Sequence, residues 1–338
     1  MASKRIEFVD VAKGIATILV IIGHLSYTPA MIKIWLYTFH IPLFFFLSGF
    51  VLNTHKYQNV KEFTLDKLKK SILPYIYLSM ITWIFVECIN QPITQIGIDS
   101  VKKFLGIFIC AKGTSYYLTL WFIISLFFAQ IIVYLLSRLN SDKKMLGGLT
   151  LLFIVGVGIS QIYQPGWIFV SDTVPMASVF VGMGYLVRKH FSVFKKLFKI
   201  QYMIIFFVLN FVFGFLNLNG IDRVDLYYQN LGNPILYLLS AICGIYMISI
   251  FSQYIRNVRL LQYIGMNSLI FYAFHRPIFI PIADRLVDML VDFQFPYISH
   301  GSIKMTIALI FICMGLCILT EIVNRYFPFI LGKKKICL

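Results

Sequence analysis

Charged residues are scarce in this chain of 338 residues. Only 13% of its residues are charged, whereas 59% are hydrophobic, and the mean hydropathy is +0.82. A soluble globular domain carries about a quarter charged residues. This scarcity excludes a soluble enzyme or binding module and indicates a polytopic membrane protein.

Several other signatures are missing. The six cysteines show no metal-ligand spacing, so we expect no metal site. Cys88 and Cys110 flank the largest predicted loop, where a disulfide and two apolar thiols both remain open. No small-residue cleavage site follows the first apolar segment, which we therefore interpret as a retained anchor. Without repeats or low-complexity tracts, residues 1–338 are predicted to form a single transmembrane domain.

Long apolar runs are what the sequence has instead. Segments of about 20 apolar residues are long enough to cross a bilayer as helices. We predict an all-α integral membrane protein with about ten transmembrane helices. The candidate spans are Val11–Thr28, Trp35–Leu52, Ile72–Ile89, Leu118–Leu136, Met145–Ile162, Val174–Val187, Tyr202–Leu218, Pro234–Phe251, Tyr263–Ile282 and Ile303–Val323.

Basic residues are distributed unevenly between the predicted loops. Most lie on the side that holds both termini, including those of Lys67–Lys70. By the positive-inside rule, the N- and C-termini are cytoplasmic. This bias accounts for the net charge of +16 with the help of anionic membrane lipids. No nucleic-acid partner is expected, and we place the protein in the cell membrane, as a multi-pass protein of the bacterial cytoplasmic membrane.

The first span carries polar residues at membrane depth, where they are costly and usually functional. Lys13 and His24 fall in this span, and Asp10 directly precedes it. Lys13 and His24 lie about 20° apart around a helix and about 16 Å apart along it. They predict a polar stripe from the cytoplasmic surface to the outer half of the membrane. His24 is the candidate base because imidazole titrates near neutral pH; the alternative is a structural hydrogen bond.

Other polar residues have a functional and a structural interpretation. His40 and His275 fall in the outer halves of their spans, where each either supports the site or bonds a neighbouring helix. Glu87 and Asp172 either orient an imidazole or sugar hydroxyl, or are interfacial. Trp121, with other aromatic residues at the outer rim, suits sugar stacking or an ordinary aromatic belt.

Two further features concern packing and the cytoplasmic end. Ser48 lies outside any nucleophile elbow, so we interpret it as a packing residue or hydrogen-bond donor. Gly14, Gly23 and Gly49 are expected to pack the first two spans closely. Arg5 and the Lys67–Lys70 loop either bind phosphates beside Lys13 or only satisfy the positive-inside rule.

Two motifs stand out in the first part of the chain: KRIEFVDVAKGI at residues 4–15, running to GH at 23–24, and FHIPLFFFLSGF at 39–50. They resemble motifs of the membrane acyltransferase-three family, in particular of its fucose 4-O-acetylase-like sugar acetyltransferases. Weaker similarities follow in LWFI at 120–123, in 182–186, and in YIGMNS at 263–268 with His275. The resemblance extends in order from about residue 4 to residue 280.

The resemblance implies ten helices and transfer of an acyl group from cytoplasmic acetyl-CoA to a glycan hydroxyl at the outer face. His24 would be the base or transient acyl carrier, supported by His40. Lys13, Arg5 and Asp10 would hold the donor. Acetyl-CoA is then a substrate, with no permanently bound cofactor and no metal. Many members have arginine where this chain has Lys13. Lysine replaces a guanidinium, which can form two parallel hydrogen bonds to the donor, with an ammonium that acts as a point charge.

Other functional classes remain open. A transporter or flippase for an anionic or glycan substrate would use Lys13 and the histidines for binding or proton relay. A non-catalytic partner of a polysaccharide synthase is a third interpretation. The acceptor is either a lipid-linked sugar or a finished polymer, the acyl group acetyl or larger, and the oligomeric state is open.

Overall fold

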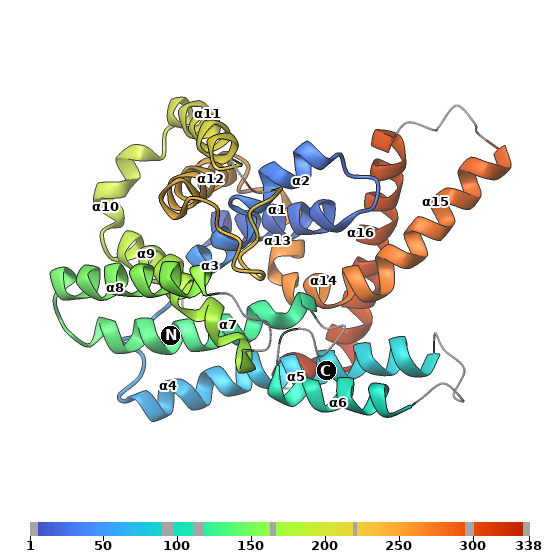
Figure 1. Cartoon of the computed structure of the whole chain (residues 1–338), viewed down its shortest axis with the longest axis horizontal. Helices are drawn as coiled ribbons and strands as arrows, with labels where there is room; N and C mark the ends of the chain where they lie inside the picture. The colour runs from blue at the N-terminus through green and yellow to red at the C-terminus, as the bar shows by residue number, and fades with distance from the viewer. Residues whose placement is uncertain are drawn as a thin grey trace.

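The computed structural model describes residues 6–89, 97–110, 112, 118–162, 167–218, 222–294 and 301–333. These residues are largely helical and form no strand, apart from an isolated β-bridge between Asp225 and Asn230. The prediction of an all-α fold is therefore confirmed for the described chain. Figure 1 shows the helices arranged around α1, which is drawn in blue near the centre.

Helices form in the predicted apolar segments but also outside them, for example at Val60–Lys67 and Ile98–Ile109. The α-helices are α1 Glu7–His24, α2 Ala30–Tyr37, α3 His40–Phe50, α4 Val60–Lys67, α5 Leu73–Trp83, α6 Ile98–Ile109, α7 Trp121–Ser137, α8 Asp142–Gln161, α9 Val174–Lys189, α10 Phe191–Phe194, α11 Ile200–Leu216, α12 Pro234–Tyr254, α13 Arg259–Met266, α14 Ser268–Phe274, α15 Ile280–Gln294 and α16 Gly301–Tyr326. Short π-helical turns are η1 Leu68–Ile72, η2 Ile84–Ile89 and η7 His275–Phe279, and 3₁₀ turns are η4 Leu118–Leu120, η5 Ile168–Thr173, η6 Lys195–Leu197 and η9 Pro328–Leu331.

Within the described residues, five helical runs are long and apolar enough to cross a membrane. They are Ala30–Phe50, Asp142–Gln161, Ile168–Lys189, Pro234–Tyr254 and Gly301–Tyr326. A sixth is added if the pair Phe191–Leu197 and Ile200–Leu216, bent by 79°, forms one span.

Each of the ten predicted segments contains helix, but some are interrupted. The predicted span Tyr263–Ile282 is divided into α13, α14, η7 and the start of α15. Pro277 lies within η7, where its missing N–H and its ring prevent regular α-helical bonding. Such π-helical turns are frequent at functional sites.

The α1 helix packs against α13 with almost no space between the backbones. A Cβ atom on Gly14 would lie 2.1 Å from the carbonyl oxygen of Leu261, and one on Gly265 would lie 1.8 Å from that of Asp10. Small residues permit such close helix packing in membranes. The partner of Gly14 is thus α13, and the expected packing of the first two spans against each other is wrong for this glycine.

The α3 helix makes a similar contact with α9. A Cβ atom on Gly49 would lie 1.9 Å from the carbonyl oxygen of Val181, and one on Gly184 would lie 2.0 Å from that of Phe46. The sequence predicts close packing at Gly49, but against the first span, whereas the observed partner is α9. Gly23 faces the ring of Tyr37, which belongs to the predicted second span, so its partner segment is the expected one but the contact is with a side chain. Together these contacts hold α1 and α3 inside the helix assembly.

Candidate active site

The α1 helix ends at a cavity of about 260 Å³. His24, the last residue of α1, and His40, the first residue of α3, both line it. Trp121 at the start of α7 is also part of the lining. The structure therefore brings together three of the residues that the sequence singled out. The complete lining is Gly23, His24, Lys33, Tyr37, His40, Ile41, Pro42, Thr119, Trp121, Arg223, Asp225, Leu226, Tyr227, Tyr228, Tyr237, Tyr272 and Arg276.

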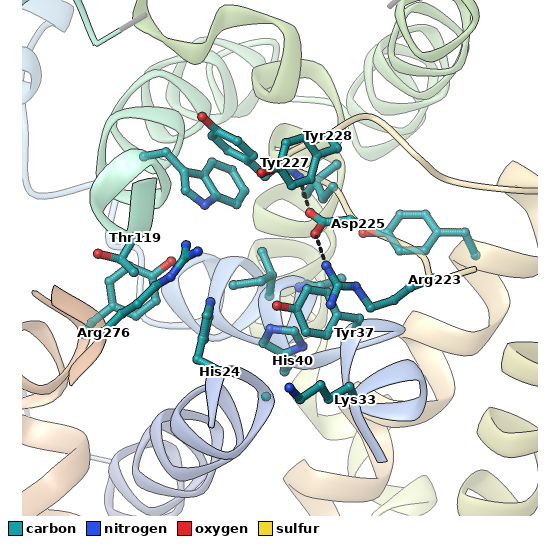
Figure 2. Close-up of a pocket in the computed structure, with 17 residues that line it drawn as sticks. His24, Lys33, Tyr37, His40, Thr119, Arg223, Asp225, Tyr227, Tyr228 and Arg276 are labelled. Atoms are coloured by element: carbon teal, nitrogen blue, oxygen red, sulfur yellow. Dashed lines mark hydrogen bonds and ion pairs between the residues drawn. The ribbon is translucent and has the colours of Figure 1, made fainter. Parts of the chain in front are cut away.

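The hydrogen bonds of His24 determine which ring nitrogen can act as a base. Nδ1 of His24 lies 2.8 Å from the carbonyl oxygen of Val20, one turn earlier in α1. Because a carbonyl only accepts, Nδ1 of the neutral ring carries the proton and donates it. Nε2 then has a free lone pair. Figure 2 shows the ring projecting into the cavity between Arg276 on one side and Tyr37 with His40 on the other.

His275 contacts the same imidazole from the buried side. Its Nδ1 lies 3.0 Å from the carbonyl oxygens of both Phe271 and Tyr272, so this nitrogen is also the donor. Nε2 of His275 is left as an acceptor and lies 3.5 Å from Nδ1 of His24. The residue is completely buried at the start of η7. This arrangement favours the same tautomer of His24 that the Val20 carbonyl selects.

His40 repeats this pattern on the neighbouring helix. Its Nδ1 lies 2.6 Å from the carbonyl oxygen of Leu36, which leaves Nε2 as an acceptor. The ring packs edge-on against Tyr37, with 4.8 Å between the ring centroids. In their neutral form, both cavity-lining histidines therefore carry the proton on Nδ1 and present the Nε2 lone pair.

Charged residues that the sequence analysis did not select complete the lining. Arg223 forms an ion pair of 3.1 Å with Asp225, and its guanidinium lies 3.8 Å from the centroid of the Tyr37 ring. Arg276 directly follows His275 and lies within electrostatic range of His24. A charged residue inside a predicted span was the signal that identified Lys13, and the same signal marks Arg276. Arg223 lies in a polar loop and carried no such signal.

The segment that carries Arg223 and Asp225 is fixed in place by several bonds. Asp225 and Asn230 exchange backbone hydrogen bonds of 2.8 and 3.0 Å, and the Asp225 carboxylate accepts from the Tyr227 N–H at 3.0 Å. The buried ammonium of Lys112 donates to Asp172 and to the Tyr227 carbonyl. Asp172 thus contributes an anchor for the segment. Burial raises the pKa of Asp225 above its usual range, although the neighbouring Arg223 opposes that shift.

The other end of the polar stripe opens on a second cavity, of about 470 Å³. Asp10 and Lys13 line it together with Arg188 and Lys189 at the end of α9. Its other lining residues are Ile6, Val9, Phe50, Val51, Leu52, Asn53, His55 and Tyr185. Arg5 lies outside the described residues. The α1 helix is continuous from Lys13 to His24, so the two ends of the stripe lie on one helix face.

A third cavity, of about 280 Å³, lies beside the same helix. Lys13, Ser48 and Lys70 line it, and so does Tyr272, which also lines the cavity at His24. The Ser48 hydroxyl donates to the Phe44 carbonyl at 2.8 Å. Lys13 is therefore common to the second and third cavities, and Tyr272 is common to the third and the first. Each end of the stripe therefore borders a cavity, and the third cavity shares one lining residue with each of the other two.

Glu87 lies away from these cavities. Its buried carboxylate accepts from Ser100 at 2.6 Å and pairs with Lys103 at 3.0 Å, which joins η2 to α6. The side chain of Cys88 lies outside the described residues, and Cys110 has a free thiol. Among the described residues, no three His, Cys, Asp or Glu side chains are grouped closely enough to hold a metal ion.

The comparison with protein families agrees with this geometry. A family model described as an acyltransferase domain matches residues 6–330. The chain belongs to the acyltransferase 3 family. As a member of this family with several apolar helices, it is a membrane acyltransferase. The searches of curated proteins and of solved structures gave no match.

Proposed function

We propose that this protein is a membrane O-acetyltransferase that transfers the acetyl group of cytoplasmic acetyl-CoA to a hydroxyl of a cell-surface or exported glycan at the outer face. The observation that carries this proposal is the run of cavities along α1. Lys13 borders the second and third cavities, and Tyr272 borders both the third cavity and the His24 cavity. Cationic groups and an imidazole with a free lone pair thus lie along one helix, each beside a cavity.

The proposed topology has about ten crossings with both termini in the cytoplasm, as the charge bias predicts. The second and third cavities then open toward the cytoplasm, and the His24 cavity opens outward. The sugar-acetylase branch of the family is the proposed subgroup. The donor travels along the α1 face in an extended conformation, about 16 Å from Lys13 to His24.

The donor's phosphates are proposed to bind the cationic groups at the Lys13 end. Lys13, Arg188 and Lys189 surround the second cavity, and Lys70 borders the third. Arg5 and Asp10 are predicted to complete this end of the site. Because charge-assisted bonds to phosphate are strong, Lys13→Gln is expected to weaken coenzyme A binding about tenfold, equivalent to about 1.4 kcal/mol. Lys61→Gln, an exposed change on α4, is the matched control for isothermal titration.

His24 is proposed to act through Nε2. It accepts the proton of the acceptor hydroxyl while that oxygen attacks the thioester carbonyl carbon. The tetrahedral oxyanion collapses, the C–S bond breaks and coenzyme A leaves as the thiol with the proton from His24. Arg276 supplies positive charge near the developing oxyanion, and His40 orients the acceptor. Transient acylation of His24 is the variant of this mechanism in which Nε2 itself attacks the thioester.

The test is acyl transfer in proteoliposomes with labelled acetyl-CoA at the cytoplasmic face and mixed glycans at the other. His24→Ala should abolish labelling of glycan, whereas Lys61→Gln, the exposed change on α4, should not, because Lys61 lines none of the three cavities. Label on glycan that survives His24→Ala would refute the assigned base. Donor binding with no transfer, together with glycan flux across the bilayer, would favour a transporter.

A further inference from the structure

The cavity at His24 has an excess of positive charge. Lys33, Arg223 and Arg276 line it, and the only carboxylate in its lining is Asp225. Asp225 is already paired with Arg223. Among the residues that the structure describes, neither Lys33 nor Arg276 forms an ion pair. Two positive charges therefore remain without a paired carboxylate.

The cationic groups occupy two places in the cavity. Arg276 is the group within electrostatic range of His24. Arg223 is within range of both His40 and Lys33, and Lys33 is also within electrostatic range of the Asp284 carboxylate, which does not line the cavity. Figure 2 shows Arg276 on one side of the His24 ring, and Lys33 with Arg223 on the other, beside Tyr37 and His40. Arg276 thus lies near the His24 ring. Lys33 and Arg223 form a second cationic group on the other side of that ring.

Hydrogen-bond donors also remain unused beside the pair. Nε of Arg223 is buried without a hydrogen-bond partner in the described structure, and so is the hydroxyl of Tyr237. Tyr237 is completely buried and belongs to the cavity lining. Buried polar groups without partners are costly, so these atoms indicate a ligand with acceptor oxygens.

The donor does not need these groups. Its phosphates have separate cations at Lys13, Arg188 and Lys189 in the second cavity, about 16 Å along α1 from His24. A neutral sugar needs hydrogen bonds and stacking, which the aromatic lining supplies, but no net positive charge. The Lys33 ammonium, and the Nε–H of Arg223 that has no partner in the described structure beside the ion pair with Asp225, are therefore surplus to both of these tasks.

Resting on the proposed function, we propose that the acceptor is an anionic sugar whose carboxylate or phosphate binds Lys33 and Arg223. Guanidinium recognises both groups through paired N–H bonds, and an ammonium adds a point charge. The anion would lie near Tyr37, with the sugar ring extending toward the acceptor hydroxyl at His24. Uronic acids and sugar phosphates share this chemistry.

Binding to the purified full-length protein in nanodiscs tests the inference directly. Trp121 lines the cavity, so its fluorescence reports occupancy, and Trp121→Phe identifies its share of the signal. Methyl glucuronide, glucose 1-phosphate and inorganic phosphate are compared with methyl glucoside. We expect at least one anionic sugar to bind tenfold or more tightly than methyl glucoside. Whether methyl glucuronide or glucose 1-phosphate binds more tightly distinguishes a carboxylate site from a phosphate site. Inorganic phosphate that binds as tightly as the anionic sugars would reveal a simple anion site. Equal affinity for charged and neutral sugars, or no binding of any anionic sugar, would overturn the proposal.

Lys33 provides the decisive variant because it is half-buried and forms no ion pair within the described part of the chain. Lys33→Gln should remove most of the preference for the anionic sugar, and Lys33→Arg should restore it. Lys102→Gln, an exposed change in α6 with 70% of its side chain accessible, should leave the preference intact. A preference unchanged in Lys33→Gln would contradict the inference.

The proposed function is measured separately, as His24-dependent hydrolysis of acetyl-CoA with water in place of a sugar. Hydrolysis without a preference for anions would overturn the acceptor class and leave the acyltransfer mechanism standing. Absence of His24-dependent hydrolysis would count against the mechanism itself, whichever sugars bind.

Discussion

Nε2 of His275 lies 3.5 Å from Nδ1 of His24, a contact between residues 251 positions apart in the chain. Backbone carbonyls occupy Nδ1 of both rings, so the contact is between a donor on His24 and an acceptor on His275. A neighbouring residue that hydrogen-bonds one nitrogen of a functional histidine fixes the tautomer and orientation of that ring. His275 therefore positions His24 and does not itself line the cavity.

His275→Asn is expected to lower kcat about 10- to 100-fold, the range seen when a group that orients a functional histidine is lost. The KM for acetyl-CoA should change little, because the donor cations lie at the other end of α1. A pH–rate profile checks the role, since loss of the acceptor changes the environment of His24 and should displace the profile. An unaltered profile with a uniformly lower yield of folded protein would indicate a structural role only.

Tyr272 is expected to control passage between the third cavity and the cavity at His24, since it lines both. Tyr272→Trp adds bulk where the acyl arm must pass, so acetyl transfer should fall at least tenfold while coenzyme A still binds. Titration of coenzyme A and hydrolysis of acetyl-CoA measure the two effects separately.

Tyr77→Trp is the matched control for this prediction. Tyr77 is half-buried against Phe329 and lines none of the three cavities, so both measurements should stay near the wild-type values. Transfer that is normal in Tyr272→Trp would show that the acyl group does not pass this residue.

Close packing of α1 on α13 gives a prediction for stability. In Gly265→Ala the new Cβ would lie 1.8 Å from the Asp10 carbonyl oxygen, so one helix must shift. Overpacking of this kind costs about 1–3 kcal/mol, and the thermal unfolding midpoint in detergent should fall. Gly158→Ala has no atom within 4 Å of its added Cβ and should leave the midpoint unchanged or slightly raised. Equal midpoints for the two variants would contradict the contact.

The polar stripe could be predicted from the sequence because helical periodicity is local. Lys13 and His24 lie within one helix, and their shared face follows from 100° of rotation per residue. The apolar lengths likewise identified where helices form. The partners of the glycines could not be predicted, because apolar faces of membrane helices differ little in composition and Gly14 is compatible with any close neighbour.

The rest of the site depends on contacts between distant segments. Arg223 lies in a polar loop. The sequence around a loop arginine looks the same whether its side chain lines a cavity or faces solvent. Only the ion pair with Asp225 and the contact with Tyr37 give it a position. Glu87 shows the converse, since its depth in a span suggested a site residue and its partners Ser100 and Lys103 join two helices instead.

Asp225 is expected to make acceptor binding depend on pH. Burial raises the pKa of this carboxyl, so the neutral form persists in the folded protein to higher pH than in the unfolded chain. As the pH rises through the folded pKa, Asp225 becomes charged, competes for Arg223, and stability from this group decreases. An anionic sugar should therefore bind more tightly below that pKa than above it.

Asp225→Asn tests this dependence because asparagine resembles the protonated carboxyl and can still accept from the Tyr227 N–H, the 3.0 Å bond of the wild type. The variant should bind methyl glucuronide more tightly than the wild type at neutral pH and should show a flatter pH profile. Lys112, which also acts on Asp225 electrostatically, stays paired with Asp172 in both proteins. Weaker binding in Asp225→Asn would mean that the carboxylate helps to hold the acceptor, through its hydroxyls, and does not merely neutralise Arg223.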